Sequence, residues 1–553
     1  MSRRKKKKSL PLPFVLGVIG AAAVCCIIYF VVAGSGPNTK IADQNALFSI
    51  ESENSAAIIL NGEELEEKGL VADGTIYVPY TTVWSSINSG FYLEGDTLYR
   101  TLPEQSYSWS LGDGSGALYK SEDGTVYISE SCIAEYSDLD IDSYTEPYRL
   151  VIRNDWDALQ GASVTKDTQI RVKADERGEI ATEVVSGESL ELLEEGDSWS
   201  LVLSADGHKG YIQNQNIEKT GLISHEENTS YTFPSLADGQ TVKMVWHYID
   251  SVANNQYLDG MLADSPSLNV ISPTWFIIDN AQGDLISYAD QDYMDKAHNT
   301  YGLKVWALIN DYSKEDSSTG EILASKENRQ RIISQLMESA QTYGFDGINV
   351  DFETITNSQA PAYLQFLREL TLEAHARGLV VSTDNYVPTY TKQYKRAEQA
   401  KIVDYVVIMG YDEHTSVSEE IGSVASINFV EEGITDTLKE VPASKVILAV
   451  PFYTRGWTQT FGEEGFTSEI VNMTDEAEYI DSHGITLSWD ESVGQYTGSA
   501  EDSNARYTIW VEDAQSIGLK LDLISKYSLG GASAWRIGTE TADIWNVWKE
   551  KLG

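Results

Sequence analysis

The chain has 553 residues, a hydrophobic content of 42% and a formal net charge of −44 at pH 7. This length predicts three or four domains of ordinary size. So large an acidic excess excludes a nucleic acid as a partner and favours a solvated acidic surface over a specific cation site. The sequence contains no EF-hand loop and no pair of His residues at metal-ligand spacing, so we expect neither a metal ion nor a cofactor.

The N-terminus combines a basic cluster with an apolar run. Six basic residues at positions 3–8 precede an uncharged stretch from Phe14 to Ala33, and about twenty such residues span a hydrocarbon core as a helix. We therefore predict a single-pass membrane anchor within residues 1–36, with its basic end in the cytoplasm and the catalytic part of the chain exported to the cell wall. A cleaved signal peptide is the alternative, with a cleavage site at positions 31–33.

Residues 37–154 show short runs of strand-forming residues broken by Gly and Asp, which predicts a small β-rich domain. Leu60-Asn61-Gly62 is followed by Ile76 to Pro79 and then by Tyr92 to Asp96. This order resembles the stalk-like domain of exported Firmicute proteins, although such motifs consist mainly of turn residues.

Residues 155–220 predict a second β-rich domain with more regular strands. A strand that carries Arg171 is followed by a Gly turn, by a strand that begins at Trp199, and by Gly210-Tyr211-Ile212. This order resembles a bacterial SH3 domain, and the resemblance implies attachment to the peptides of cell-wall peptidoglycan. A barrel that serves only as a spacer is the alternative, because one aromatic pair does not specify a ligand.

From residue 238 to residue 553, apolar strands alternate with long amphipathic stretches. Eight strands in such a length predict an α/β fold, the (β/α)₈ TIM barrel. Residues 462–506, between strands seven and eight, are too many for a plain connection and predict a small α+β insertion that forms one wall of a cleft. The candidate strands are 242–248, 270–279, 303–310, 345–353, 379–384, 403–411, 446–453 and 531–537.

The fourth candidate strand carries polar residues where both faces should be buried. Asn349, Asp351 and Glu353 alternate with apolar residues and therefore share one face. Burial of carboxylates is costly unless they are paired, hydrogen-bonded or protonated. Because active sites of TIM barrels lie at the carboxyl ends of strands, Glu353 is predicted to meet Tyr411 at the end of strand six and Trp535 near the end of strand eight.

Four motifs in this order resemble glycoside hydrolase family 18. Its signature Asp-x-x-Asp-x-Asp-x-Glu corresponds to Asp346, Asn349, Asp351 and Glu353. The strand-six motif corresponds to Met409-Gly410-Tyr411-Asp412, the strand-seven motif to residues 451–457 with Thr454 in place of Gly, and the strand-eight motif to residues 530–535.

The resemblance implies retaining hydrolysis of β-linked N-acetylglucosamine in which the acetamido group of the substrate is the nucleophile. Glu353 would be the acid and base, Asp351 would hold the acetamido N–H and stabilise the oxazolinium ion, and Tyr411 would donate to the acetamido oxygen. Asp412 and Trp535 would contact the sugar. The remaining candidates for substrate contact are Met409, Asn349, Asp346, Tyr248, Asn385 and Trp457, together with Tyr386; for Tyr248, Asn385, Tyr386 and Trp457, a place in the core or on the surface is an equal alternative.

Asn349 departs from the fuller signature, which has Asp at this position. Since Asn cannot ionise, we expect a changed pH profile rather than lost activity. Asn349 and the run from Tyr411 to His414 are similar to the spore-lytic branch of the family, which favours peptidoglycan over crystalline chitin. A non-catalytic glycan-binding protein on the same fold and a purely structural wall tether are the alternatives.

Overall fold

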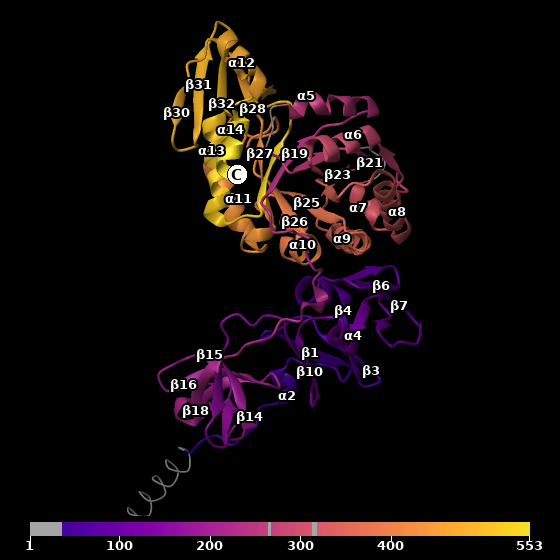
Figure 1. Cartoon of the computed structure of the whole chain (residues 1–553). Coiled ribbons are helices and arrows are strands. Elements are labelled where there is room, and N and C mark those ends of the chain that lie inside the picture. The colour runs from indigo at the N-terminus through magenta and orange to yellow at the C-terminus, as the bar shows by residue number, and fades with distance from the viewer. Residues whose placement is uncertain (1–35, 264–266, 312–317) are drawn as a thin grey trace, which may run out of the picture. The chain divides into compact units, whose positions relative to one another are not determined.

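A computed structural model describes residues 36–263, 267–311 and 318–553 (Figure 1). The chain divides into two compact units. The first comprises the described residues up to Ile87 together with Leu111–Asn228, and the second comprises Asn88–Ser110 and Thr229–Gly553. The predicted membrane span at residues 14–33 lies outside the described residues. Within those residues, no helix is both long enough and apolar enough to cross a membrane.

The first unit contains two β-sheets. The strand order of the first sheet is β10-β11-β1-β3-β4-β9-β8, with β2 paired to β1. Asp73 and Gly74 join β3 to β4 with positive φ angles of 51° and 81°, as a tight hairpin turn requires. The elements are α2 (Gln44–Leu47), β1 (Ser55–Leu60), β2 (Glu63–Glu64), β3 (Gly69–Ala72), β4 (Thr75–Pro79), α3 (Tyr80–Thr82), β8 (Leu118–Lys120), β9 (Val126–Ser129), α4 (Glu130–Glu135), β10 (Asp140–Thr145) and β11 (Tyr148–Arg153).

The second sheet of this unit has the strand order β14-β13-β17-β16-β15-β12-β18. Seven buried aliphatic residues, Ile170 and Val202 among them, form its core. Arg171 is also buried, and its guanidinium group donates to the carbonyl groups of Asn38 and Gly178, so this side chain is part of the framework. The strands are β12 (Gln160–Val164), β13 (Thr168–Arg171), β14 (Ile180–Val184), β15 (Ser189–Glu194), β16 (Trp199–Ser204), β17 (Lys209–Gln213) and β18 (Ile217–Leu222).

The second unit is built on eight parallel strands that close into a barrel. Their order is β20-β19-β33-β27-β26-β25-β24-β23, and β23 pairs with β20 to complete the circle. The barrel strands are β19 (Val242–His247), β20 (Val270–Pro273), β23 (Lys304–Asn310), β24 (Gly347–Asp351), β25 (Val380–Tyr386), β26 (Tyr405–Met409), β27 (Val446–Pro451) and β33 (Gly531–Trp535).

The predicted TIM barrel is therefore confirmed, with one interrupted strand. The predicted strand 270–279 is divided into β20 and β21 (Phe276–Ile278), and β21 pairs with β22 (Leu285–Ser287) as an antiparallel hairpin. Pro273, the last residue of β20, has no N–H to continue a ladder. Helices lie around the outside of the strands (Figure 1): α5 (Leu258–Leu262), α6 (Gln291–Lys296), α7 (Thr319–Leu323), α8 (Lys326–Tyr343), α9 (Ala360–His375), α10 (Arg396–Ile402), α11 (Ile427–Thr437), α13 (Ala514–Tyr527) and α14 (Ile544–Leu552).

The predicted α+β insertion lies between β27 and β33. A five-stranded sheet in the order β29-β28-β32-β31-β30 packs with one helix around a small apolar core. The insertion begins at Tyr453 rather than at residue 462, because β28 follows β27 after a single residue. Its elements are β28 (Tyr453–Thr460), β29 (Thr467–Asn472), α12 (Glu476–His483), β30 (Ser488–Asp490), β31 (Gln495–Glu501) and β32 (Ala505–Val511).

Residues 88–110 depart from the predicted domain boundaries, because they group with the barrel. They form a three-stranded sheet, β5 (Phe91–Glu94), β6 (Thr97–Thr101) and β7 (Ser106–Ser110). Arg329 of α8 is fully buried beside this sheet and pairs with Glu94 at 3.2 Å and with Glu369 of α9 at 3.1 Å. Gln365 of α9 also donates to Thr101. The predicted domain 37–154 is therefore not one unit.

Candidate active site

Strand β24 carries the central residues to the carboxyl end of the barrel. It begins at Gly347, where a Cβ atom would lie 2.6 Å from the Trp306 ring and 2.8 Å from the Val380 carbonyl oxygen. Only glycine therefore lets β24 pack so closely between its neighbours. The strand ends at Asp351, and Glu353 lies in the loop that follows.

Glu353 is held from two sides while its side chain stays accessible to solvent. Its Oε2 atom accepts a hydrogen bond from the Tyr386 hydroxyl at 2.6 Å, and its backbone N–H donates to Asp311 Oδ2 at 2.6 Å. Desolvation by the surrounding protein atoms raises the pKa of Glu353, the Tyr386 hydrogen bond opposes this rise, and the charges of Asp311 and Asp412 add to it. A carboxyl group with a raised pKa that a ligand can reach is suited to general acid catalysis.

Asp351 lies deeper than Glu353. Burial raises the pKa of Asp351 well above its usual range, and the charges of Asp384, Glu353 and Asp311 raise it further. Its Oδ1 atom is buried, with no hydrogen-bond partner in the described part of the chain. Such an atom is costly unless it is protonated or meets a ligand.

The loop after β26 brings Tyr411 and Asp412 to the same end of the barrel. Tyr411 is buried, and burial raises its pKa well above the usual value, with further contributions from Tyr453 and Asp351. Asp412 has a positive φ of 59°, and its Oδ1 atom accepts a hydrogen bond from the Tyr453 hydroxyl at 2.6 Å. Met409 ends β26 and is buried in the barrel core.

Two predicted aromatic residues lie where a ligand can reach them. Trp535 ends β33, is partly exposed, and its ring centroid lies 6.0 Å from that of Trp246. Tyr248 follows β19, is 44% exposed, and its ring lies 5.0 Å from the Arg536 guanidinium carbon. Both residues lie at the carboxyl ends of their strands, as predicted.

The structure places two motif residues away from the cleft, which corrects their prediction as substrate contacts. Asp346 precedes β24 at the amino end of the barrel, where it accepts hydrogen bonds from the Val305 N–H and from His298. Because an extended chain rises about 3.3 Å per residue, the seven residues from Asp346 to Glu353 place them about 23 Å apart, beyond opposite ends of β24. Asn349 is fully buried inside the barrel, and its polar atoms bond to protein side chains.

Asn385 and Trp457 are core residues, so the core alternative holds for both and they are not substrate contacts. Asn385 is 1% exposed and exchanges two hydrogen bonds with Gln399 of α10, so it lies on the outer face of β25. Trp457 is fully buried, and its indole N–H donates to the Gly422 carbonyl group at 2.9 Å.

Two acidic residues of the site, Asp311 and Asp384, were not among the predicted residues. Asp311 directly follows β23, and Asp384 lies on the inner face of β25, two residues before Tyr386. The alternation of Ser382, Asp384 and Tyr386 along the strand is the signal that could have identified Asp384.

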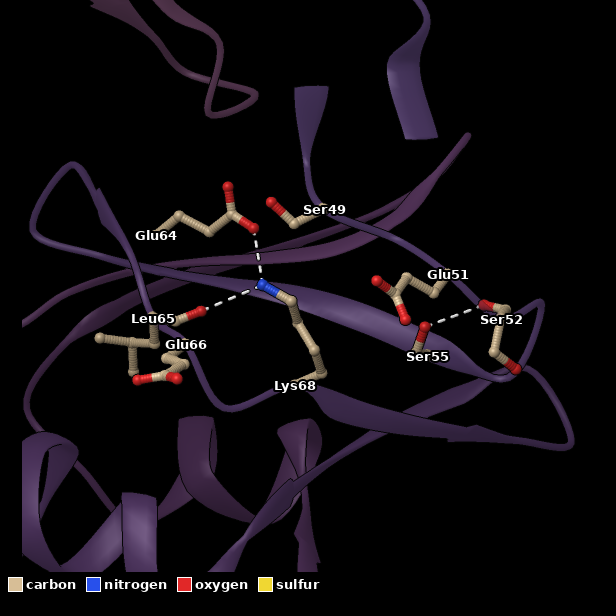
Figure 2. Close-up of a pocket in the computed structure, with 8 residues that line it drawn as sticks. All are labelled: Ser49, Glu51, Ser52, Ser55, Glu64, Leu65, Glu66 and Lys68. Atoms are coloured by element: carbon tan, nitrogen blue, oxygen red, sulfur yellow. Dashed lines mark hydrogen bonds and ion pairs between the residues drawn. The ribbon is translucent and has the colours of Figure 1, made fainter. Parts of the chain in front are cut away.

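A hollow of about 680 Å³ in the first unit is lined by Ser49, Glu51, Ser52, Ser55, Glu64, Leu65, Glu66 and Lys68 (Figure 2). Lys68 donates to Glu64 at 2.6 Å and to the Leu65 carbonyl group at 3.1 Å. The cation of this hollow is therefore already paired, and the other charged side chains that line it are carboxylates, so we assign it no catalytic role.

Comparison with known protein families gives two matches. The model of glycosyl hydrolases family 18 matches residues 244–540, which is more than half of the chain. The model of the bacterial SH3 domain matches residues 166–218 in the first unit. The family 18 match covers the barrel strands from Met244 of β19 to the end of β33, and the SH3 match covers β13 to β17 of the second β-sheet of the first unit.

Individual proteins are similar to the barrel region. The chain is 26% identical to the glycosylase YvbX of Bacillus subtilis (strain 168) over 44% of this chain and 74% of that protein. It is 30% identical to the cortical fragment-lytic enzyme of the same organism over 41% of this chain and 54% of the enzyme, so the match spans about half of that relative.

Solved structures share the fold. The chitinase of Chromobacterium violaceum ATCC 12472 superposes with a TM-score of 0.50 at 23% identity, over 57% of this chain and 99% of the other. The spore cortex-lytic enzyme SleL of Bacillus cereus superposes with a TM-score of 0.50 at 20% identity, over 60% of this chain and 79% of the other. At these identities the likeness concerns the barrel fold alone.

Proposed function

The chain belongs to glycosyl hydrolases family 18, and we propose that it is a membrane-anchored, exported glycosidase that cleaves β-linked N-acetylglucosamine in peptidoglycan by a retaining, substrate-assisted mechanism. The observation that carries this proposal is the accessible Glu353 carboxyl group, which has a raised pKa and lies two residues after the partly buried Asp351.

In this mechanism, Glu353 protonates the glycosidic oxygen while the acetamido oxygen of the substrate attacks the anomeric carbon. Asp351 accepts a hydrogen bond from the acetamido N–H and stabilises the positive charge of the oxazolinium ion, for which its unpartnered buried oxygen is suited. The Tyr411 hydroxyl donates to the acetamido oxygen. Glu353 then removes a proton from the water that opens the oxazolinium ring, so the anomeric configuration is retained.

Peptidoglycan is the proposed substrate for two reasons. The relatives include a cortical fragment-lytic enzyme, and a bacterial SH3 domain precedes the barrel. In this proposal the SH3 domain holds peptidoglycan peptides, and residues 14–33 hold the chain in the cell membrane. A chitinase, chitinase A1 of Niallia circulans, is also 27% identical over 42% of this chain, so chitin-type oligomers belong in the test.

The test is product release from purified peptidoglycan and from N-acetylglucosamine oligomers by the full chain. The Glu353→Gln variant should lose about 10²-fold or more in rate, because it cannot donate the proton. Glu373→Gln is the matched control, since Glu373 is an exposed residue of α9 paired with Arg377. Binding without turnover by the unaltered chain would contradict the enzyme proposal, and cleavage of oligomers alone would contradict peptidoglycan as the substrate.

A further inference from the structure

Asn349 has a fixed orientation inside the barrel. Its Oδ1 atom accepts hydrogen bonds from the Trp246 indole N–H at 2.8 Å and from Ser272 at 3.2 Å. Because an indole N–H can only donate, the oxygen of the amide must face Trp246. The Asn349 NH₂ group therefore points the other way, toward β25, where it donates to Ser382 at 3.0 Å and to Asp384 Oδ1 at 2.8 Å.

Asp384 lies beside Asp351 on the neighbouring strand. The parallel register pairs Asn349 with Ser382 and Val350 with Thr383, so Asp351 and Asp384 follow side by side. Adjacent strands are about 4.8 Å apart, and side chains on the same face of both are in contact range. Asp384 is 2% exposed.

Asn349 stands where the fuller signature has Asp, and the carboxyl group that Asn349 contacts is that of Asp384. An aspartate at position 349 would direct a second carboxylate at Asp384, and two like charges at hydrogen-bond distance are strongly unfavourable. Asn349 removes this conflict and donates a hydrogen bond instead. The site therefore keeps three carboxyl groups, those of Asp351, Glu353 and Asp384, and Asp384 is supplied by β25 rather than by β24.

We propose that Asp384 is a positioning residue that replaces the missing carboxylate at position 349 and shares one proton with Asp351. This inference rests on the proposed glycosidase function. When the positive oxazolinium charge develops, the O–H bond of Asp351 breaks and an O–H bond forms on Asp384. The negative charge thus moves to Asp351, where it faces the oxazolinium ion, and no other reactant is needed.

The titratable groups that interact electrostatically with Asp384 include no cation. They are Asp351 and Glu353 from β24 and its loop, Tyr411 after β26, and Tyr363 of α9. Burial raises the pKa of Asp384 well above its usual range, the Asn349 hydrogen bond opposes this rise, and the charge of Glu353 adds to it. Carboxyl groups in such a cluster cannot all ionise, so a proton stays within it.

The test compares three variants of the full chain. Asp384→Asn should lower kcat about 100-fold and change KM less than about threefold, and the acid limb of its pH–rate profile should move. The exchange variant Asn349→Asp/Asp384→Asn keeps one carboxyl and one amide in contact and should recover most of kcat. Ser382→Ala is the control, because Ser382 also contacts Asn349 but carries no charge.

The kinetic comparison requires an active glycosidase, so it gives no result if the proposed function is wrong. A second measurement therefore follows the protonation of Asp351 directly and does not depend on turnover. In the spectrum of protein labelled with carboxyl-¹³C aspartate, the Asp351 resonance should titrate at lower pH in Asp384→Asn than in the unaltered chain. An inactive chain that still shows this shift would contradict the glycosidase proposal and support the shared proton. An unchanged Asp351 titration, or an exchange variant as slow as Asp384→Asn, would overturn the inference.

Discussion

At the scale of single residues, the carboxyl end of the barrel brings together acidic and aromatic side chains from different strands. Glu353, Asp351, Tyr411, Asp412 and Trp535 were predicted to converge, and each lies at the carboxyl end of the barrel. The signature spans a whole strand, however, and nothing in its spacing separates residues of the cleft from residues of the barrel interior or the opposite end.

Parity along a strand carries more of this information than the motif does. On β25, Asp384 and Tyr386 face inward, whereas Asn385 contacts Gln399 of α10. The prediction included both Asn385 and Tyr386, although adjacent residues of a strand face opposite sides of the sheet. The contact partner of Trp457 could not be predicted, because Gly422 lies in the segment after Asp412 and meets Trp457 of the insertion only in the folded chain.

The hydrogen bond from Tyr386 to Glu353 gives a prediction at this scale. The bond stabilises the ionised carboxylate and lowers the pKa of Glu353 against the effect of desolvation. Tyr386→Phe should therefore raise the pKa of Glu353 and move the alkaline limb of the profile of kcat/KM against pH to higher pH, since the acid must be protonated. Rate measurements from pH 4 to pH 9 check this, and a shift of that limb to lower pH would contradict it.

At the scale of elements, buried ion pairs contribute to the packing of the β5–β7 sheet and of the insertion against the barrel. Arg329 of α8 lies between Glu94 of β5 and Glu369 of α9 and also donates to the Leu323 carbonyl group at 2.8 Å. The sequence did not predict this contact, because Glu94 and Arg329 are far apart in the chain and β5 has the same strand pattern as the first unit. The barrel and its insertion were predictable, because the alternation of strands with amphipathic stretches and the length of the connection can be recognised in the sequence without knowledge of distant contacts.

The Arg329 network predicts a large loss of stability when the cation is removed. Arg329→Ala leaves the buried Glu369 without its cationic partner, and we expect it to lower the free energy of unfolding by about 3 kcal/mol. Arg331→Ala, two residues along α8 with an exposed pair to Asp284, should change it by less than about 1 kcal/mol. Urea unfolding of the full chain compares the two variants, and equal effects would show that the buried network does not hold the β5–β7 sheet.

A buried ion pair also joins the insertion to the helices of the barrel. Lys520 of α13 and Glu512 form an ion pair at 2.9 Å, and both are buried. Gln495 of β31 donates to Glu512 and accepts a hydrogen bond from Ser423, which lies in the segment after Asp412. These contacts connect the insertion to the segment that follows Tyr411 and Asp412.

Lys520→Met should therefore lower the free energy of unfolding by an amount that depends on pH. Burial raises the pKa of Glu512, and Lys520 opposes this rise, so the variant raises that pKa further. A carboxyl group with a raised folded-state pKa loses stability as pH increases above its unfolded value of about 4.3. The destabilisation relative to the unaltered chain should be larger at pH 7.5 than at pH 5 in thermal unfolding, and the opposite order would contradict this account.

At the scale of the whole molecule, an acidic chain carries one catalytic barrel and one β-rich unit with a bacterial SH3 domain. The negative net charge predicts that nucleic acid is not a partner. The periodicity of apolar residues predicts that two β-rich regions precede the barrel. The predicted anchor, the export of the chain and the attachment to the wall remain proposals. They would place the active site of the barrel on the peptidoglycan side of the membrane.

The anomeric configuration of the first product tests the central claim most directly. Proton NMR during the first minutes of hydrolysis of a β-linked N-acetylglucosamine oligomer by the full chain distinguishes the two anomers before they interconvert. Substrate assistance with Glu353 as acid and base predicts the β-anomer first, and product formation that is slower by about 10²-fold or more in Glu353→Gln. Initial release of the α-anomer would contradict the account, because it would require direct attack of water on the opposite face of the sugar.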